Sequence, residues 1–399
     1  MLTLDRIYQA AHVLKGVARK TDLILSPNLA PDCDLYLKAE NLQITGSFKV
    51  RGAYFKIAML PEHEKAKGVI ACSAGNHAQG VALAAQHAGI DATIFIPSVA
   101  PLSKIEATKR MGAHIRLVDG VYDDAFDAAL EFQKESDGVF IHPFDEIDVI
   151  AGQGTIALEI IEQLPDIDAI VVPVGGGGLI SGVAFVLKML KPTCKVYGVQ
   201  AVGAGSMHNS LRDKKRESLS SVSTFADGIA VKSPGVMTYE YCAQYVDGIV
   251  TVSDDEIATA ILTLMEQQKL VAEGAGAVAV AAVMFDKLPV KGKKVCAIVS
   301  GGNIDVNILS RVICRGLLTT GRLSELNIEM IDRPGQLKEV STIIASLGAN
   351  VTKVMHNQGG ENTDINGCFL HVSMETKNKS HYMEIKQAIQ KAGYEIVED

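Results

Sequence analysis

Residues 172–179 read Val-Pro-Val-Gly-Gly-Gly-Gly-Leu, and this stretch decides which class of fold the chain can adopt. An apolar strand ends here, and four consecutive glycines lead from it into a helix. Such a turn exposes backbone N–H groups beside the positive end of the helix, which is typical of a phosphate-binding loop. The G-x-G-x-x-G spacing of dinucleotide-binding folds is absent, because Ile180 and Ser181 stand at the sixth positions. The stretch therefore predicts a loop for the phosphate of a smaller cofactor, formed by Gly175, Gly176, Gly177, Gly178 and Leu179.

Short β-branched runs alternate with longer helical ones along the first 320 residues. The expected strands are residues 34–38, 68–73, 92–97, 114–118, 139–142, 169–174, 195–200 and 295–300. The helices expected between them include residues 80–89, 122–135, 155–163 and 254–267. Strands that alternate with helices in this way indicate an α/β fold with open parallel sheets, which bind ligands at the carboxyl ends of their strands.

The pattern changes near residue 320. Residues 316–322 are expected to be a connector, and apolar residues alternate with polar ones from Leu326 onward. The order strand, helix, strand, strand, helix, strand follows, with a Gly/Asn/Asp-rich turn between the two central strands. This order predicts a ferredoxin-like α+β domain over residues 326–399, separate from a catalytic domain over residues 1–320.

The composition of the chain excludes several classes of protein. The 399 residues carry a net charge of −8, which argues against nucleic-acid binding, and no apolar segment is long enough to cross a bilayer. Asp5 and Arg6 interrupt the N-terminal segment, so no signal peptide is expected and a cytoplasmic protein is predicted. Seven cysteines without a C-x-x-C pair predict neither a disulfide framework nor a metal site.

Lys49 follows the run Thr45-Gly46-Ser47-Phe48 and is a candidate catalytic residue. With Ser47 as the N-cap, Lys49 falls in the first turn of a helix. The positive end of that helix disfavours an ammonium group and lowers the pKa of the lysine, as a Schiff-base lysine requires. A first-turn lysine taken alone is more often a solvated surface charge. The glycine loop in the same chain favours the catalytic interpretation.

Two further motifs each follow a predicted strand. Residues 73–77, Ser-Ala-Gly-Asn-His, open a helix, and their backbone N–H groups suit a carboxylate. His77 could act as a base, although a packed or capping histidine is the more common case. Ser300 precedes two glycines, but the G-x-S-x-G elbow of a nucleophilic serine is absent because Ile298 replaces its first glycine. A neutral hydroxyl that contacts a ligand ring fits Ser300 at least as well.

With these four motifs in this order and spacing, residues 1–320 resemble the fold-type-II pyridoxal-phosphate (PLP) enzymes, whose fold is tryptophan synthase β-like. The resemblance is strongest to the threonine dehydratases (threonine ammonia-lyases). It implies that Lys49 carries the cofactor beside Phe48, that Asn76 hydrogen-bonds its phenolic oxygen, and that Ser300 faces its ring nitrogen. The glycine loop would then hold the phosphate. The substrate carboxylate would be bound by Ser73, Ala74, Gly75, Asn76 and His77.

The C-terminal segment resembles an ACT domain, a module that senses amino acids. The resemblance implies an amino-acid effector, such as isoleucine or valine, at the loop that contains Asp332, Pro334, Gly335 and Gln336. It also implies a homo-oligomer, either a dimer or a tetramer.

The implied reaction is PLP-dependent deamination of L-threonine to 2-oxobutanoate and ammonia by elimination of water, with L-serine giving pyruvate. Serine racemases of this fold have a serine where Ala74 stands, and acidic metal ligands after the strand that here ends in Gln200. A racemase and a divalent-metal site are therefore disfavoured. A serine-preferring dehydratase and a β-replacement lyase remain as alternatives, as do roles in isoleucine biosynthesis or in threonine breakdown. A non-catalytic amino-acid sensor is disfavoured by the intact Lys49 and glycine loop.

Overall fold

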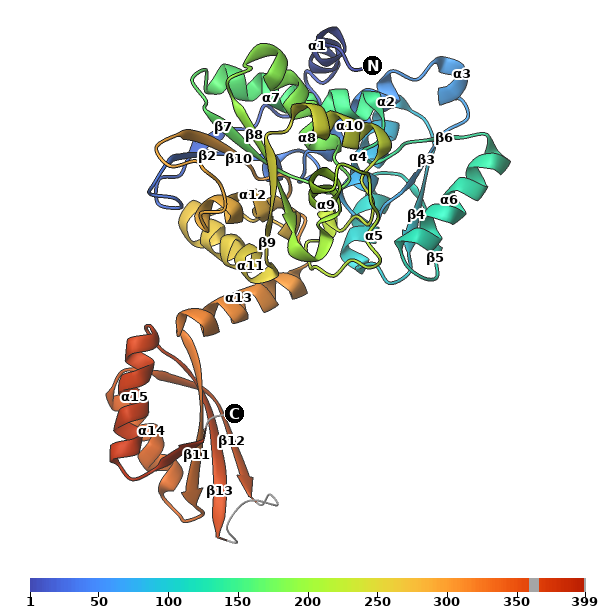
Figure 1. Cartoon of the computed structure of the whole chain (residues 1–399). Helices are drawn as coiled ribbons and strands as arrows, with labels where there is room; N and C mark the ends of the chain where they lie inside the picture. The colour runs from blue at the N-terminus through green and yellow to red at the C-terminus, as the bar shows by residue number, and fades with distance from the viewer. Residues whose placement is uncertain (359–365, 398–399) are drawn as a thin grey trace. The chain divides into compact units, whose positions relative to one another are not determined.

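The computed structural model describes residues 1–358 and 366–397. Contacts divide these residues into two compact units, Met1–Ile308 and Leu309–Asp399, each of which is described by itself (Figure 1). The expected Gly/Asn/Asp-rich turn of the C-terminal segment lies mostly outside the described residues. No helix in the described part of the chain is both long and apolar enough to cross a membrane.

The larger sheet of the N-terminal unit has six strands in the order β1-β2-β10-β7-β8-β9. All neighbouring pairs are parallel except β1 with β2. The strands are β1 Leu23–Leu25, β2 Asp34–Lys38, β7 Ala169–Pro173, β8 Lys195–Ala201, β9 Gly248–Val252 and β10 Lys294–Ile298. The sequence pattern predicted four of these and missed β1 and β9. β9 is half-buried along most of its length, because it lies at the edge of the sheet and lacks a long apolar run.

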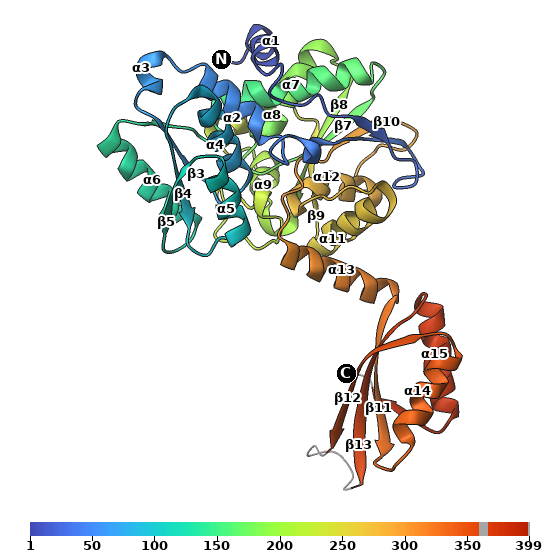
Figure 2. The ribbon, with the colours of Figure 1, turned by 180° about the vertical axis from the view of Figure 1, so that it is seen from behind.

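The smaller sheet contains four parallel strands in the order β5-β4-β3-β6, all of which the sequence predicted. They are β3 Val69–Cys72, β4 Ala92–Pro97, β5 His114–Val118 and β6 Val139–Phe140. Figure 2 shows α6 on one face of this sheet, and α4 and α5 on the other. The two sheets together confirm the expected α/β fold with parallel sheets.

Thirteen helices of the described chain precede the C-terminal sheet. They are α1 Leu4–Val13, α2 Lys49–Ala58, α3 Glu62–Lys65, α4 Asn76–Ala88, α5 Leu102–Arg110, α6 Tyr122–Ser136, α7 Ile147–Gln163, α8 Gly178–Leu190, α9 Ser206–Arg212, α10 Val236–Tyr245, α11 Asp254–Thr263, α12 Gly274–Met284 and α13 Val306–Thr320. Short turns add η1 Glu40–Leu42, η2 Val202–Ala204, η3 Asp227–Ile229 and the π-helical η4 Leu264–Gln268. α13 covers most of the segment that was expected to be an irregular connector.

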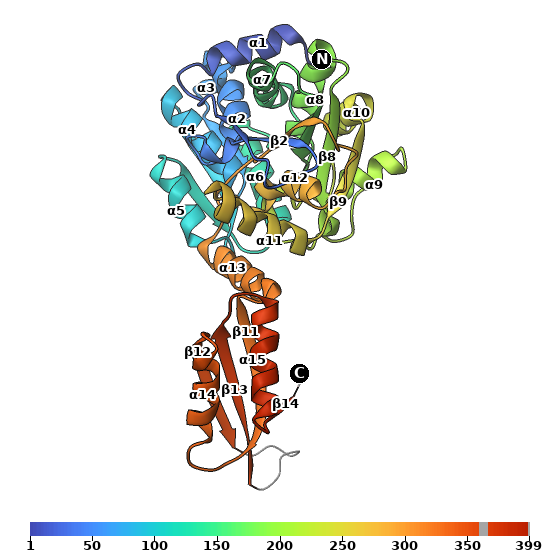
Figure 3. The same cartoon turned by 90° about the vertical axis from the view of Figure 1, so that its left-hand side faces the viewer.

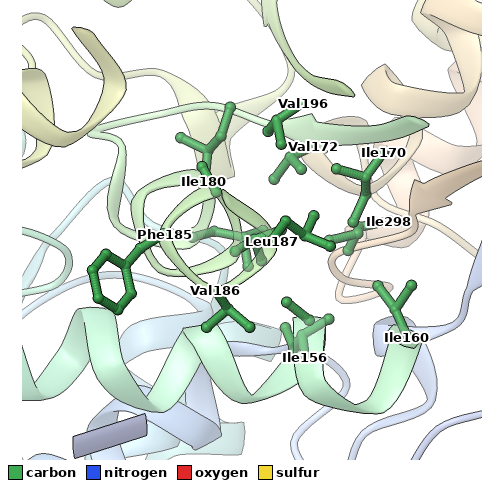
Figure 4. Packing of buried hydrophobic residues seen from close by; sticks show 14 of the residues in the cluster. Ile156, Ile160, Ile170, Val172, Ile180, Phe185, Val186, Leu187, Val196 and Ile298 are labelled. Atoms are coloured by element: carbon green, nitrogen blue, oxygen red, sulfur yellow. The ribbon is translucent and has the colours of Figure 1, made fainter. Parts of the chain in front are cut away.

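The main core lies where α7 and α8 pack against the larger sheet (Figure 4). Ile156 and Ile160 of α7 meet Val186 and Leu187 of α8, and all four side chains are buried. The two helices approach closely at Gly182, where an added Cβ would lie 2.3 Å from a backbone carbonyl oxygen of α7. This packing fixes the start of α8, and therefore the glycine loop that precedes it.

Arg51 anchors the first turn of α2 although its side chain is only 1% exposed. Its Nε and Nη2 donate to the Glu40 carboxylate over 2.8 and 2.9 Å. Its Nη1 donates to Glu159 of α7 over 2.6 Å. A buried charge is stable only when it is paired and hydrogen-bonded, and Arg51 is fully paired. These bonds hold α2, which begins at Lys49, against η1 and α7.

The C-terminal unit has the predicted order of elements, so the ferredoxin-like arrangement is confirmed. Its elements are β11 Leu323–Ile331, α14 Gln336–Ser346, β12 Asn350–Gln358, β13 Gly367–Glu375, α15 Lys379–Lys391 and β14 Glu395–Val397. The antiparallel sheet has the order β12-β13-β11-β14, and both helices lie on one of its faces (Figure 3). The side chains that alternate along β11 and β13 form a core with the two helices.

We predict that Arg51→Met lowers the free energy of unfolding by about 3–5 kcal/mol, because it leaves the buried Glu40 carboxylate without its partner. Equilibrium denaturation in urea measures the change. Lys20→Met is the matched control, because it removes a solvent-exposed ion pair with Glu162 and should cost about 1 kcal/mol or less. Equal losses in the two variants would contradict the anchoring role of Arg51.

Candidate active site

The sequence candidates of the N-terminal unit meet around one cavity of about 940 Å³. Its wall includes residues from all four motifs, which come from different parts of the chain. These are Phe48, Lys49, Ser73, Ala74, Gly75, Asn76, His77, Gly175, Gly176, Gly177, Gly178, Leu179 and Ser300. The cavity lies at the carboxyl ends of β3, β7 and β10, as expected for parallel sheets.

Lys49 is the first residue of α2, so the expected first-turn position is correct. The expected N-cap is wrong, because Phe48 occupies the cap position without a side-chain cap bond. The Ser47 hydroxyl is instead buried without a hydrogen-bond partner among the described residues. The backbone of Ser47 pairs with Gly301 instead of forming the helix cap.

The Lys49 amine is buried and lies at the cavity wall. Its Nζ donates to the Pro143 carbonyl oxygen over 2.9 Å and lies 5.4 Å from the centroid of the Phe48 ring. Burial lowers the pKa of Lys49 to about 8, and the nearby Glu273 carboxyl opposes this shift. The sequence attributed the lowering to the end of the helix, whereas loss of hydration is its largest cause. With a pKa of about 8, roughly a tenth of the amine is neutral at pH 7.

Backbone hydrogen bonds join the Lys49 loop to the Ser300 loop. Ser47 forms a bridge with Gly301, and the Phe48 N–H donates to the Ser300 carbonyl oxygen over 3.1 Å. The Gly302 N–H donates to the Gly46 carbonyl oxygen over 2.9 Å. A Cβ on Gly46, which has φ +72°, would lie 2.4 Å from the Asn303 side chain. This short ladder sets the spacing between the two motifs.

Side-chain amides extend the connection to the third motif. Asn303 Nδ2 donates to Asn76 Oδ1 over 2.8 Å and to the Thr45 carbonyl oxygen over 2.8 Å. Asn76 Nδ2 in turn donates to Glu273 Oε1 over 2.6 Å. The three strand-to-helix junctions thus share one hydrogen-bonded network.

Glu273 is a residue of the site that the sequence reasoning missed. It precedes α12 and lies at the cavity wall, with only 3% of its surface exposed. Burial raises the pKa of this carboxyl to about 7, and Asp227 adds to the effect. One sequence feature could have identified Glu273: it is the single acidic residue in the otherwise apolar run 270–285. An isolated charge in such a run is costly to bury unless it has a partner, which Asn76 provides.

The glycine loop presents free backbone donors to the cavity. None of the N–H groups of residues 175–178 donates to another residue in the described chain. A Cβ at Gly176 would lie 2.5 Å from the Phe144 ring, and one at Gly177 would lie 2.7 Å from Thr238. Gly177 also has φ +102°, which other residues rarely adopt. The loop therefore requires glycine, and its open N–H groups precede the positive end of α8.

The segment 73–77 joins β3 to α4, which begins at Asn76. The Ser73 hydroxyl accepts a hydrogen bond from the Gly75 N–H over 3.2 Å. His77 is buried, and its Nε2 donates to the Ile141 carbonyl oxygen over 2.8 Å. Burial lowers the pKa of His77 to about 3, so its imidazole is neutral at pH 7. This geometry is that of a packed histidine.

The remaining candidates have these positions. Ser300 is 3% exposed, and its hydroxyl donates to the Ala275 carbonyl oxygen over 3.3 Å. Gly335 caps the N-terminus of α14 and Gln336 is its first residue, so the proposed effector loop leads directly into that helix. Asp332 and Pro334 belong to the same loop of the C-terminal unit.

Comparison with known proteins identifies the chemistry of this cavity. The family described as pyridoxal-phosphate dependent enzyme matches residues 14–301, which include Lys49, the segment 73–77, the glycine loop and Ser300. The chain belongs to this family. Among its relatives, the L-threonine ammonia-lyase of Thermotoga maritima is 52% identical over 398 residues, covering 99% of both chains.

Solved structures of fold-type-II members of the family have the same architecture. The processed form of threonine deaminase isoform 2 from Solanum lycopersicum is 41% identical, with a TM-score of 0.73 over 78% of this chain and 88% of that one. The serine racemase of maize is 35% identical, with a TM-score of 0.75 over 79% of this chain and 98% of that one.

The residues present in the cavity fit the PLP of this family. Four consecutive glycines line the cavity with unpaired N–H groups, and a Cβ at Gly176, Gly177 or Gly178 would clash with Phe144 or Thr238; a run of open backbone donors suits a phosphate. The buried Lys49 amine suits a covalent bond to a carbonyl carbon, because its lowered pKa makes the neutral form available.

In the cofactor-free enzyme, we predict that Lys49→Met raises the free energy of unfolding. Folding lowers the pKa of this amine from 10.5 to about 8, so a protonated Lys49 destabilises the folded state by about 3 kcal/mol. The gain from Lys49→Met should be complete below pH 8. It should fall as the pH rises from about 8 to 10.5 and vanish above 10.5, where the lysine is neutral in both states. Denaturant unfolding across this range measures it.

Lys56→Met is the control for this prediction. Lys56 lies on the same helix but forms an ion pair with Glu146, so its removal should not stabilise the protein. A Lys49→Met protein that is no more stable than the unsubstituted enzyme at neutral pH would contradict the desolvation argument.

Proposed function

We propose that this PLP-dependent enzyme is an L-threonine ammonia-lyase. It deaminates L-threonine to 2-oxobutanoate and ammonia, and L-serine to pyruvate and ammonia. The observation that carries the proposal is the 52% identity to an L-threonine ammonia-lyase along 99% of both chains. The buried amine and the glycine loop of the same cavity support it, because the reaction needs both.

Residues from the four motifs would hold the cofactor. Lys49 would bind it covalently, and the N–H groups of residues 175–178 would hold its phosphate. The Ser300 hydroxyl would face its ring nitrogen, and the Asn76 amide would face its phenolic oxygen. When bound, PLP supplies a conjugated ring that withdraws electrons from the Cα atom of an attached amino acid.

The Lys49 amine also moves the proton at Cα. Its burial and lowered pKa keep a neutral fraction available near pH 7, and a neutral amine can accept a proton. Loss of the Cα proton and of the β-hydroxyl, which leaves as water, converts threonine into an enamine. The enamine then adds water and releases ammonia, so that threonine yields one 2-oxobutanoate and one ammonia.

The substrate carboxylate is assigned to residues 73–77. The first turn of α4 begins there, and unpaired N–H groups at a helix start favour an anion. This contact would hold the substrate with its Cα–H bond toward Lys49.

Ala74 favours elimination over racemisation. Racemisation requires a second acid that protonates Cα from the face opposite to Lys49. Ala74 lines the cavity and its methyl group carries no proton to donate. Deamination is therefore preferred for this chain, although the serine racemase of maize shares its fold.

We predict that the PLP-loaded enzyme forms 2-oxobutanoate from L-threonine without an added nucleophile. Lys49→Ala should lower kcat by at least about a hundredfold, because it removes the proton acceptor. The assay is the rate of 2-oxo acid formation. Lys56→Ala, seven residues further along α2 and outside the cavity wall, should keep turnover close to that of the unsubstituted enzyme.

Three outcomes would overturn this assignment. Turnover only after addition of a thiol or another nucleophile would indicate a β-replacement lyase. D-Serine formed from L-serine as fast as pyruvate would indicate a racemase. A Lys49→Ala protein with full activity would exclude Lys49 as the proton carrier.

The C-terminal unit supports a regulatory proposal. The loop before α14 leads into a helix start, which can receive an amino-acid carboxylate. We assign isoleucine or valine to this loop as effector, and a homo-dimer or homo-tetramer as the assembly. Seven free cysteines are compatible with action in the reducing cytoplasm.

We predict that Gly335→Arg abolishes the response of the full-length enzyme to isoleucine and valine, because it places a long side chain in the proposed effector loop. Gly348→Arg is the matched control. Both glycines have positive φ, +98° and +84°, and neither has an atom within 4 Å of its Cβ position, but Gly348 lies at the other end of α14. Threonine turnover measured against effector concentration tests this, with an expected coupling of roughly 5- to 150-fold. An enzyme that neither binds nor responds to these amino acids would exclude the sensing role.

A further inference from the structure

Three side chains with metal-binding atoms converge at one end of the C-terminal sheet. Asp332, His356 and Cys368 each offer one such atom, and the three atoms lie within 4.8 Å of one another. His356 Nε2 lies 3.6 Å from Asp332 Oδ1. Neither His356 nor Cys368 takes part in the proposed reaction or in the proposed effector loop.

The strand register brings these residues together. Gln358 of β12 pairs with Cys368 of β13, and His356 stands two residues before Gln358 on the same side of its strand. Met330 of β11 also pairs with Cys368, and Asp332 follows two residues later. The convergence therefore follows from backbone pairing among three neighbouring strands (Figure 3). It does not depend on the rotamer of one long side chain.

The His356–Asp332 distance and the exposure of the three groups suit a tetrahedral metal ion, and Cys368 Sγ lies within 4.8 Å of the other two ligand atoms. Bonds of about 2.0–2.3 Å to zinc keep the ligand atoms of a tetrahedron roughly 3–4 Å apart, and the His356–Asp332 distance of 3.6 Å falls in this range. Cys368 is 1% exposed, whereas the His356 and Asp332 side chains are 42% and 36% exposed. One ligand is thus buried, and two face solvent, from which a metal ion can enter.

A neighbouring amide orients the carboxylate. The Gln358 Nε2 donates to Asp332 Oδ2, the oxygen that does not face His356. Hydrogen bonds of this kind, from outside the ligand set, fix the direction of metal ligands. The arrangement leaves Asp332 Oδ1 directed at the imidazole.

We propose that Asp332, His356 and Cys368 bind one Zn²⁺ ion per chain, with water as the fourth ligand. Sulfur and imidazole ligands select zinc over magnesium and calcium, which prefer oxygen ligands. The sequence predicted no metal site, because these three residues are far apart along the chain and follow no C-x-x-C or H-x-x-H spacing. The proposal does not depend on the substrate of the enzyme.

The experiment uses the full-length, tag-free holoenzyme. Calorimetry with Zn²⁺ should show one site per chain, and Co²⁺ should add a sulfur-to-cobalt charge-transfer band to the difference spectrum. Cys368→Ser should remove this band, and His356→Ala should weaken Zn²⁺ binding at least tenfold. Because His356 is exposed on an edge strand, its substitution leaves the packed core intact.

Two controls separate this site from ordinary surface groups. His114→Ala removes another histidine that lies 3.6 Å from an aspartate, Asp91, and that pair is not among the clusters with metal-ligand geometry. Cys314→Ser removes the exposed cysteine. Both should bind Zn²⁺ as the unsubstituted enzyme does.

Unchanged Zn²⁺ affinity in Cys368→Ser and His356→Ala would overturn the proposal, as would a Co²⁺ spectrum without the sulfur band. His356 and Asp332 would then form only an ion pair. Turnover of threonine is measured in parallel, so that failure of the zinc site and failure of the proposed enzymatic function give different results.

Discussion

The short backbone ladder between residues 46–48 and 300–302 is the interaction on which the rest of the site depends. One side of it is the end of β10 in the larger sheet, and the other side is the loop that starts α2. Its hydrogen bonds set the separation of Lys49 and Ser300 before any ligand is present. Asn303 then connects this ladder to Asn76, and Asn76 connects to Glu273. Three strand-to-helix junctions with no local relation in the sequence thereby become one rigid frame around the cavity.

Two cations in the first turn of α2, Lys49 and Arg51, show how the surroundings of a charged group decide its protonation state. Arg51 is enclosed by the carboxylates of Glu40 and Glu159, which raise its pKa and keep it charged. Within the described residues, the Lys49 amine has a single hydrogen-bond partner, the Pro143 carbonyl oxygen, and burial lowers its pKa to about 8. Arg51 therefore stays ionised, whereas Lys49, the proposed catalytic residue, can lose its proton. Both results follow from the free-energy cost of removing a charge from water. The carboxylates next to Arg51 offset this cost, whereas the carbonyl dipole next to Lys49 does not.

The four glycines of the loop have no side chains, and Ala74 has no hydroxyl group; both absences matter for the proposed reaction. Side chains at residues 176–178 would collide with the surrounding protein. At Ala74, a methyl group stands where a hydroxyl would supply a second proton donor to the cavity. In the proposed reaction, the missing side chains of the glycine loop leave its N–H groups open to the phosphate, and the methyl group of Ala74 provides no proton for Cα.

The sequence by itself determined the alternation of strands and helices, the ferredoxin-like C-terminal unit and the four motifs around the cavity. These features are encoded locally, in hydrophobic periodicity and in short glycine-containing junctions. The edge strands β1 and β9 were not predicted, because they are only partly buried and their hydrophobic pattern is weak.

Only the tertiary structure decided which distant groups meet. Glu273 reaches Asn76, Arg51 reaches Glu159, and Cys368 reaches His356 through sheet order, helix packing and strand register. The tertiary structure was also needed to identify Phe48 as the N-cap of α2 and burial as the main cause of the lowered Lys49 pKa. Hydrogen bonds between residues far apart in the chain, and the burial of their charges, produce no periodic pattern in the sequence. They arise only once the fold has brought those residues into contact.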